Sequence, residues 1–401
     1  MIALLVIGYS GFYLCRSHFS VAKPLLLETV PGLDKAALGL IASVGTLLYA
    51  LGKFIHGPLA DKWGGKPLFL YGLFGAIAFT LLFGLGGPPL FMLAWSANRF
   101  VQSAGWGGMV RIVSQWSTPQ KYGLAMAVVS LSYLFGDFLS RLLLGYWVGL
   151  GATWSQLFVW SAMGLGLIAI PVVWLLRERP EGAEMVPATA SIQSGTASGG
   201  GSIFARPDFW MVCFLSFCFT LLRETFNEWT PTYLNEAAGL AKAAAGQASS
   251  VFPLFGGLSV LAVGAFSDRI ARETNPMRRL AVVPYGLGLT AVLLGILGQV
   301  PGLNPAVTVG LVGLIGFCLI GPYSLLAGAT SLDFGGSQKA ASAAGLIDGV
   351  GYIGGILSGY AVGSLAQNLG WAMSLSGLGV MCAVVALGTG LLLKYQARKF
   401  G

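Results

Sequence analysis

The stretch GPLADK at residues 57–62 recurs as GAFSDR at residues 264–269, and both follow the frame G-x-x-x-D-[KR]. The likeness reaches beyond these two stretches. Arg16 and Arg223 stand at the same offset before the two aspartates, and a proline follows each arginine at the same distance. One such match arises easily by chance, whereas three in one register indicate a chain built from two similar halves.

The composition places both halves in a membrane. Of the 401 residues, 55% are hydrophobic and 9% are charged, and the mean hydropathy is +0.76, whereas soluble domains carry about 25% charged residues. The apolar runs are long enough to cross a roughly 30 Å hydrocarbon core as helices of about 20 residues, and the frequent glycines allow such helices to pack closely. The sequence therefore predicts an all-α membrane protein and excludes a soluble core and a β-barrel.

Hydropathy divides the chain into about twelve transmembrane helices, six on each side of a polar segment. We expect these spans near residues 2–27, 36–60, 68–87, 90–116, 121–148, 153–176, 207–235, 243–267, 279–299, 305–331, 339–366 and 370–394. The predicted organisation is a six-helix bundle at 1–176, a cytoplasmic linker at 177–206 and a second six-helix bundle at 207–401. The linker contains SGTASGGGS, a composition typical of flexible segments. The first run has no basic residues before it, and we interpret it as a retained helix.

Basic residues lie mostly on one side of the predicted membrane. If both termini are cytoplasmic, the inner loops and the tail collect most lysines and arginines, while the outer loops hold only Lys35 and Lys242, with Lys23 near an outer end. This asymmetry follows the positive-inside rule and predicts the orientation. It also explains the net charge of +8, so a nucleic-acid partner, which needs a contiguous soluble basic surface, is not expected. We predict a multi-pass protein in the lipid bilayer of a bacterial inner membrane, with both termini cytoplasmic.

Parallel repeats of six spans resemble the major facilitator fold, in which an axis along the membrane normal relates two halves that bind substrate between them. Arg16 and Arg223 are well inside the first and seventh spans, where an arginine costs roughly 2.5–3.5 kcal/mol unless it faces protein or water. Equivalent positions in two repeats should face each other, so we expect both guanidiniums to converge on one cavity. A phosphate or carboxylate there would accept forked hydrogen bonds from each. The alternative is that Arg223 pairs with Glu224 or Glu228, whereas no acid is near Arg16 in its own span.

Further polar residues in the spans would extend this site. Lys53 in the second span would add positive potential, unless it snorkels toward the cytoplasm. Tyr9, Tyr13 and Arg16 share one helical face, from which the tyrosines would either donate hydrogen bonds to substrate or pack between helices. Asp348 in the eleventh span is either the partner of a cavity cation or a protonatable switch.

Two other charged sets have structural or gating interpretations. Asp137 and Arg141 are spaced i,i+4, and we interpret them as neutralising each other. The charged residues of the repeated loops are predicted to act as cytoplasmic latches that close in one conformation only, and therefore to serve gating rather than substrate choice. These latch residues are Asp61, Lys62, Asp268 and Arg269.

Enzymatic chemistry finds no support in the sequence. No nucleophile elbow, phosphate loop or metal-ligand spacing rises above chance, and His18 and His56 are isolated within spans. The five cysteines all fall in apolar segments and are interpreted as packing residues. We predict neither an enzyme nor a bound cofactor or metal.

The most specific longer motifs are distributed over the whole chain. They are GYSGFYLCR at 8–16, GKFIHG at 52–57, LR at 222–223, EWTPTYL at 228–234, GP at 321–322, KAA at 339–341 and GYIGG at 351–355. Together they resemble the organophosphate:phosphate antiporters of the major facilitator superfamily. That group contains bacterial glycerol-3-phosphate and hexose-6-phosphate transporters and the glucose-6-phosphate transporter of the endoplasmic reticulum.

This resemblance implies roles for individual residues. Arg16 and Arg223 match the two arginines that hold the substrate phosphate in the family. Lys53 matches a cavity lysine, and Tyr9 and Tyr13 match tyrosines that line the first helix. The family would imply exchange of an organophosphate for inorganic phosphate by rocker-switch alternating access.

The chain departs from the family pattern at positions that concern the organic part of the substrate. Where the glycerol-3-phosphate transporter has a fifth-span histidine followed by Asn-Val-Gly-Gly-Gly, this chain reads YLFGD at 133–137, and Tyr133 joins the substrate-binding candidates. The usual GWPP of the fourth span is GWGG at 105–108, and RFVQ at 99–102 is closer to the general R-x-x-Q motif of the superfamily.

The leading hypothesis is a secondary transporter that exchanges a phosphorylated small organic anion for inorganic phosphate and is monomeric, as is usual in the superfamily. Arg16 and Arg223 would draw together around one phosphate dianion, whose binding offsets their repulsion and lets the halves pass the occluded state. One rival is a proton-coupled carrier of organic carboxylates, with Asp137 or Asp348 as the proton site. The other is a membrane receptor that reports an external organophosphate without transporting it.

Overall fold

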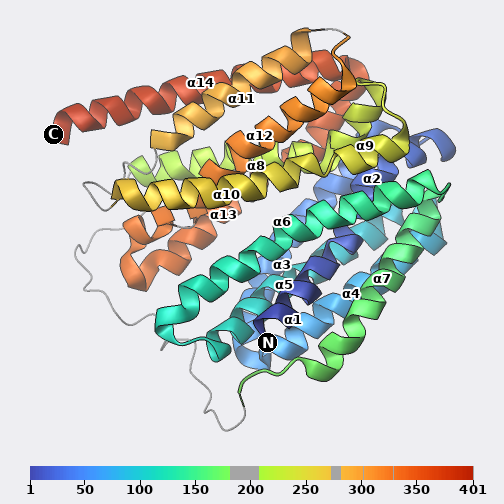
Figure 1. Cartoon of the computed structure of the whole chain (residues 1–401), viewed down its shortest axis with the longest axis horizontal. Helices are drawn as coiled ribbons and strands as arrows, with labels where there is room; N and C mark the ends of the chain where they lie inside the picture. The colour runs from blue at the N-terminus through green and yellow to red at the C-terminus, as the bar shows by residue number, and fades with distance from the viewer. Residues whose placement is uncertain (181–206, 272–280, 301, 328, 401) are drawn as a thin grey trace. The chain divides into compact units, whose positions relative to one another are not determined.

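The computed structural model describes residues 1–180, 207–271, 281–300, 302–327 and 329–400, and this part of the chain is helical and contains no strand (Figure 1). The earlier helices are α1 (Ile2–Phe12), α2 (Leu14–Thr29), α3 (Lys35–Trp63), α4 (Gly65–Gly86), the 3-10 helix η1 (Pro88–Leu90), α5 (Phe91–Trp116), α6 (Pro119–Gly149) and α7 (Trp154–Leu175). The later helices are α8 (Pro207–Glu236), α9 (Lys242–Ala248), α10 (Val251–Ala271), α11 (Val282–Gln299), α12 (Pro305–Ala327), α13 (Ala329–Asn368) and α14 (Gly370–Phe400).

The helices confirm the predicted class of protein. Within the described residues, eleven helical segments are long and apolar enough to cross a membrane. The expected fourth span, α5, is not among them, because it carries Arg99, Arg111 and many small polar residues. The protein is therefore an all-α, multi-pass membrane protein.

Contacts divide the chain into two compact units. The first comprises Met1–Ile192, Glu228–Glu236 and Leu240–Ser250, and the second comprises Gln193–Asn227, Ala237–Gly239 and Val251–Gly401. The end of α8 and all of α9 thus belong to the first unit. The linker predicted at 177–206 falls mostly outside the described residues, so the predicted domain boundaries stay predictions.

In the first unit, α5 packs against both α3 and α4, α4 packs against α7, and α6 packs against α9 (Figure 1). Glycines allow the closest of these contacts. A Cβ atom on Gly108 in α5 would lie 2.7 Å from the carbonyl oxygen of Gly65 in α4, closer than real Cβ contacts come. The apolar core of this unit gathers around buried Phe12, Phe69 and Leu165.

In the second unit, α10 packs against α12, and α11 packs against α14 (Figure 1). Glycines also allow the close approach of these helices. A Cβ atom on Gly316 of α12 would lie 2.4 Å from the carbonyl oxygen of Phe252 in α10. Gly354 of α13 similarly faces the carbonyl of Phe217 in α8. Dispersion and close backbone approach, rather than hydrophobic burial, hold such helices together in lipid.

The first span departs from the single helix expected at 2–27. Tyr13 separates α1 from α2, and the chain is kinked at Cys15 in the first turn of α2, where φ is −92° and ψ is 20° instead of helical values. A carbonyl released from the helical ladder must find another donor within a membrane. Gln102 of α5 provides it, since its Nε2 donates to the Cys15 carbonyl oxygen at 2.6 Å. The break places Arg16 in the first turn of α2.

Candidate functional site

Arg16 is held by polar and aromatic partners on α3, on α5 and at the junction of α1 and α2, within the first unit. Its half-buried side chain donates from Nε to Gln102 Oε1 at 3.0 Å and from Nη1 to the Tyr13 hydroxyl at 3.0 Å. The guanidinium carbon lies 4.8 Å from the ring centroid of Tyr13 and 4.9 Å from that of Tyr49. These contacts fix the direction of the guanidinium within the membrane span.

A second layer of hydrogen bonds positions Gln102 itself. This fully buried amide donates to Asn98 Oδ1 at 2.6 Å, as well as to the broken turn of the first span. Asn98 in turn donates to the Ala76 carbonyl at 3.1 Å and to Thr80 Oγ1 at 2.9 Å. The orientation of Arg16 is thereby tied to α4 and α5, because each polar group in the series has a fixed partner.

Three cations surround the ring of Tyr49 in α3, within the first unit. Besides Arg16, the guanidinium carbon of Arg99 lies 4.6 Å from its centroid and the Nζ of Lys53 lies 5.5 Å from it. Arg99 also approaches the ring of Trp95, at 5.8 Å. Lys53 is half-buried and Arg99 is 5% exposed. We call Arg16, Lys53, Arg99 and Tyr49 the Tyr49 cluster.

The three tyrosines predicted near substrate have different surroundings. Tyr13 joins α1 to α2 and contacts Arg16 directly. Tyr9 is 3% exposed and packs edge-on against Trp106, at 5.7 Å between ring centroids. Tyr133 is half-buried and packs against the same apolar core. Substrate contacts of all three stay predictions.

In the second unit, Arg223 pairs with its neighbour along α8. Its Nη2 lies 2.7 Å from Glu224 Oε1, which is the alternative pairing considered from the sequence. The guanidinium carbon is 4.7 Å from the ring centroid of Tyr323 in α12. The Tyr323 hydroxyl donates to Asp348 Oδ1 in α13 at 3.4 Å. Asp348 therefore joins the surroundings of a cation, and its substrate role stays a prediction.

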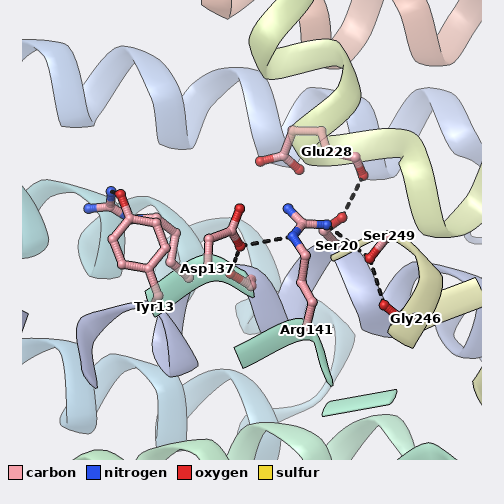
Figure 2. A network of polar contacts seen from close by, with 9 residues as sticks. Tyr13, Ser20, Asp137, Arg141, Glu228, Gly246 and Ser249 are labelled. Carbon is pink, nitrogen blue, oxygen red and sulfur yellow. Dashed lines mark hydrogen bonds and ion pairs between the residues drawn. The ribbon is translucent and has the colours of Figure 1, made fainter. Parts of the chain in front are cut away.

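Asp137 and Arg141 form the ion pair predicted from their spacing on α6. Arg141 Nε lies 2.8 Å from Asp137 Oδ1, and both residues are buried. Figure 2 shows the pair with Arg141 continuing to Ser249, which accepts from Nη1 at 3.3 Å, and Ser249 donating to the Gly246 carbonyl. Ser17 Oγ also donates to Asp137. The prediction that these two charges neutralise each other is confirmed.

A second buried ion pair joins α2 to the end of α8, within the first unit. Lys23 is fully buried, and its Nζ lies 2.6 Å from Glu228 Oε2 and 3.0 Å from the Glu228 carbonyl oxygen. Ser20 donates to the same carbonyl at 3.1 Å (Figure 2). The rings of Trp229 and Phe19 lie 4.1 and 4.9 Å from the ammonium. The lysine placed near an outer end by sequence is thus part of the protein interior.

The predicted latch residues are only partly described. Asp61 and Lys62 are exposed near the end of α3. The amides at the start of α4 donate to Glu178, Gly65 N at 2.7 Å and Lys66 N at 2.6 Å. The backbones of residues 268 and 269 lie in α10, and the side chains of Asp268 and Arg269 lie outside the described part of the chain. Latch roles stay predictions.

The sequence analysis gave no site role to four residues of these clusters, Tyr49, Arg99, Gln102 and Lys23, although each carries a recognisable signal. Tyr49 stands four positions before Lys53, so both share one face of α3. Arg99 and Gln102 are three positions apart in α5, which also brings them to one face. Lys23 follows Arg16 by two helical turns. Spacing shows which residues share a face, but not which helix lies opposite that face.

The arrangement in the first unit suits anion binding. Cations in a membrane span are costly unless they face protein, water or a ligand. Arginine presents a planar fork of donors that matches the oxygens of phosphate or carboxylate, and lysine adds a point charge. Among the described residues, no cluster of histidine, cysteine or carboxylate side chains has metal-site geometry.

Comparison with known proteins finds relatives that match over most of the chain. The Major Facilitator Superfamily profile matches residues 5–359. A probable hexose phosphate transport protein of Chlamydia trachomatis is 28% identical over 95% of this chain and 87% of its own length. A glycerol-3-phosphate transporter of Bacillus subtilis is 26% identical over 92% and 87%. The membrane sensor protein UhpC of Salmonella typhimurium is 25% identical over 95% and 88%.

Solved structures agree on the fold. A bacterial homolog of the human lysosomal transporter Spinster superposes with a TM-score of 0.78 and 15% sequence identity, covering 100% of this chain and 96% of the other. The resemblance to organophosphate transporters that the sequence motifs carried is confirmed by the sequence relatives.

Proposed function

The chain belongs to the Major Facilitator Superfamily, and on that premise we propose that it exchanges a phosphorylated small organic anion for inorganic phosphate across a bacterial inner membrane. The observation that carries the proposal is the Tyr49 cluster, which holds three cations around one ring inside a membrane-spanning unit. The hexose phosphate and glycerol-3-phosphate proteins that match over most of the chain support the same class of substrate.

In the proposed mechanism, Arg16 and Arg223 hold the substrate phosphate, with Lys53 adding positive potential and the tyrosines adding hydrogen bonds. Arg16 is already oriented by Gln102 and Tyr13, so little side-chain entropy is lost on binding. Arg223 would exchange its Glu224 partner for the phosphate. Because this exchange requires a ligand, an empty carrier would cross slowly, and obligatory exchange follows.

Gating and topology complete the proposal. The charged residues of the repeated loops, Asp61 with Lys62 and Asp268 with Arg269, would stabilise one end state of the rocker-switch cycle. Both termini would be cytoplasmic, as the distribution of basic residues indicates. The transporting species would be the monomer.

The experiment that tests this function is uptake of radiolabelled phosphate into proteoliposomes preloaded with unlabelled phosphate. Glycerol phosphate, hexose phosphates, phosphoglycerates and carboxylates are added outside as competitors. Fast exchange that one phosphate ester inhibits strongly supports the proposal and identifies the ligand class. Uptake that depends on a pH gradient and needs no internal phosphate would contradict it in favour of proton-coupled carboxylate transport.

A second candidate function is an organophosphate receptor, favoured by the similarity to the membrane sensor protein UhpC. A receptor would bind the same ligands without exchanging phosphate. Thermal stabilisation of the purified protein by a ligand measures binding, and comparing it with phosphate exchange separates the two functions. Stabilisation by a phosphate ester without any exchange would support the receptor.

A further inference from the structure

Asp137 uses only one of its two carboxylate oxygens within the part of the chain that the structure describes. Oδ1 accepts from Arg141 Nε at 2.8 Å and also from Ser17 Oγ, whereas Oδ2 accepts no hydrogen bond there. Figure 2 shows the contact to Arg141 on one oxygen and none on the other. An ionised carboxylate offers about four acceptor positions, and the Asp137 side chain is 9% exposed. One acceptor oxygen of a nearly buried residue is therefore open to a ligand.

The carboxylate lies beside the turn that carries Arg16. Ser17, which donates to Asp137, follows Arg16 directly, so the Cα atoms of these two neighbours are about 3.8 Å apart. One residue before Asp137, α6 approaches α1 closely, because a Cβ atom on Gly136 would lie 2.8 Å from the Cα atom of Ser10. Arg16, the proposed phosphate-binding residue, and the open oxygen of Asp137 thus belong to one neighbourhood of the first unit.

The charge of the ion pair decides what the open oxygen can accept. Arg141 lies 2.8 Å from Oδ1 and balances the carboxylate, so Asp137 presents little net charge to a phosphate nearby. A second cation at Oδ2 would be repelled by the Arg141 guanidinium. A neutral hydroxyl group meets no such repulsion, and its hydrogen bond to an ionised acceptor is stronger than one between neutral groups. A ligand without a donor at this position would leave the desolvated oxygen unpaired, which weakens its binding.

We propose that Asp137 determines specificity by accepting, at Oδ2, a hydrogen bond from a hydroxyl group on the organic part of the substrate. This inference rests on the proposed function, in which Arg16 holds the phosphate of the same ligand. Asp137 then has two roles, one for each oxygen: Oδ1 neutralises Arg141, and Oδ2 recognises the organic part.

The substitution D137N exchanges the proposed acceptor for a donor. Arg141 Nε and Ser17 Oγ both donate to Oδ1, so the amide oxygen should take the place of Oδ1 and the NH2 group that of Oδ2. A hydroxyl group of the ligand can pair with either side chain, because it both donates and accepts. An ether oxygen only accepts, so it should be disfavoured opposite Asp137 and tolerated opposite the asparagine.

The test compares glycerol 3-phosphate with its ether analogue, 2,3-dimethoxypropyl phosphate, as inhibitors of phosphate exchange in proteoliposomes. We expect the wild type to prefer the hydroxyl ligand at least about tenfold, and D137N to lose most of that preference. Dividing the preference of one protein by that of the other cancels the difference in size between the two ligands. S17A is the matched control: it removes the other donor to Oδ1 and leaves Oδ2 in place, so the preference should persist.

Equal inhibition by the two ligands in the wild type, or an unchanged preference in D137N, would overturn the inference. If D137N does not fold, D137L/R141M replaces the ion pair by apolar residues of similar volume, a change that buried pairs often tolerate, and it should also lose the preference. Thermal stabilisation of the purified protein by the same two ligands separates this role from transport itself. Discrimination without phosphate exchange would refute the transport function and support the role of Asp137, whereas exchange without discrimination would refute that role alone.

Discussion

Single residues of the first unit show how a charge is kept within a membrane span. Arg16 is not a bare cation in lipid, because Gln102 and the Tyr13 hydroxyl accept hydrogen bonds from two of its nitrogens. Both acceptors are neutral, so they orient the guanidinium without cancelling its charge. Asp137 has the opposite effect on Arg141, since a carboxylate at 2.8 Å neutralises it.

This contrast predicts different outcomes for the same substitution at two arginines. Arg16→Lys should reduce phosphate exchange at least a hundredfold, because a point charge cannot donate at once to Gln102, Tyr13 and phosphate. Arg141→Lys retains the ion pair with Asp137 and should keep most of the activity. Exchange in proteoliposomes, with expression and monodispersity as controls, measures both. Substantial exchange by Arg16→Lys would argue against phosphate binding at this residue.

The buried pair of Lys23 and Glu228 makes a second prediction at this scale. Lys23→Met should lower the free energy of unfolding by about 3–5 kcal/mol, because it leaves a buried carboxylate without its partner. The double variant Lys23→Met with Glu228→Gln should recover most of that loss. Lys35 and Glu236 form a more exposed pair at 2.8 Å, where Lys35→Met should cost less than about 1 kcal/mol. Denaturation in detergent micelles measures these differences, and equal costs at the two lysines would contradict the burial argument.

Helices in both units are joined by close backbone approach at glycines. The contact between α10 and α12 depends on Gly316, whose Cβ position is filled by the Phe252 carbonyl at 2.4 Å. Gly310 of the same helix, by contrast, has open space at its Cβ position. The sequence alone does not separate the two kinds, because both occur in apolar stretches of similar composition.

Two glycines of α12 provide a matched test of this packing. Gly316→Ala should lower the free energy of unfolding by about 1–3 kcal/mol, since helix backbones must move apart to admit a methyl group. Gly310→Ala, with nothing within 4 Å of its Cβ position, should be neutral or slightly stabilising. Thermal unfolding of the purified variants gives the comparison. Equal free energies of unfolding for the two variants would mean that α10 and α12 can move apart without loss of stability.

At the scale of the whole molecule, the positive-inside asymmetry predicts which loops face the outside. The five native cysteines are buried, so we expect them to contribute little to the maleimide labelling of an introduced cysteine. Leu150→Cys, in the exposed turn after α6, should react with a membrane-impermeant maleimide in intact cells. Thr118→Cys, in the exposed turn before α6, should react only after permeabilisation. The reverse pattern would invert the proposed topology.

The sequence by itself determined the membrane class, most of the spans, the repeat and the ion pair of α6. These features are local: they follow from runs of apolar residues, from fixed offsets and from i,i+4 spacing, which operate along one helix. The intramembrane arginines were also recognisable from the sequence, because a charged residue within an apolar run can be identified without knowing how the run packs.

Only the tertiary structure decided which neighbours those charges have. The break of the first span at Cys15 depends on an amide from α5, and Lys23 meets Glu228 across 205 positions of the chain. Arg223 of α8 lies against Tyr323 of α12, and Arg99 of α5 lies against Tyr49 of α3. Such contacts join faces of different helices, and their geometry is set by packing, which residue spacing within one helix does not encode.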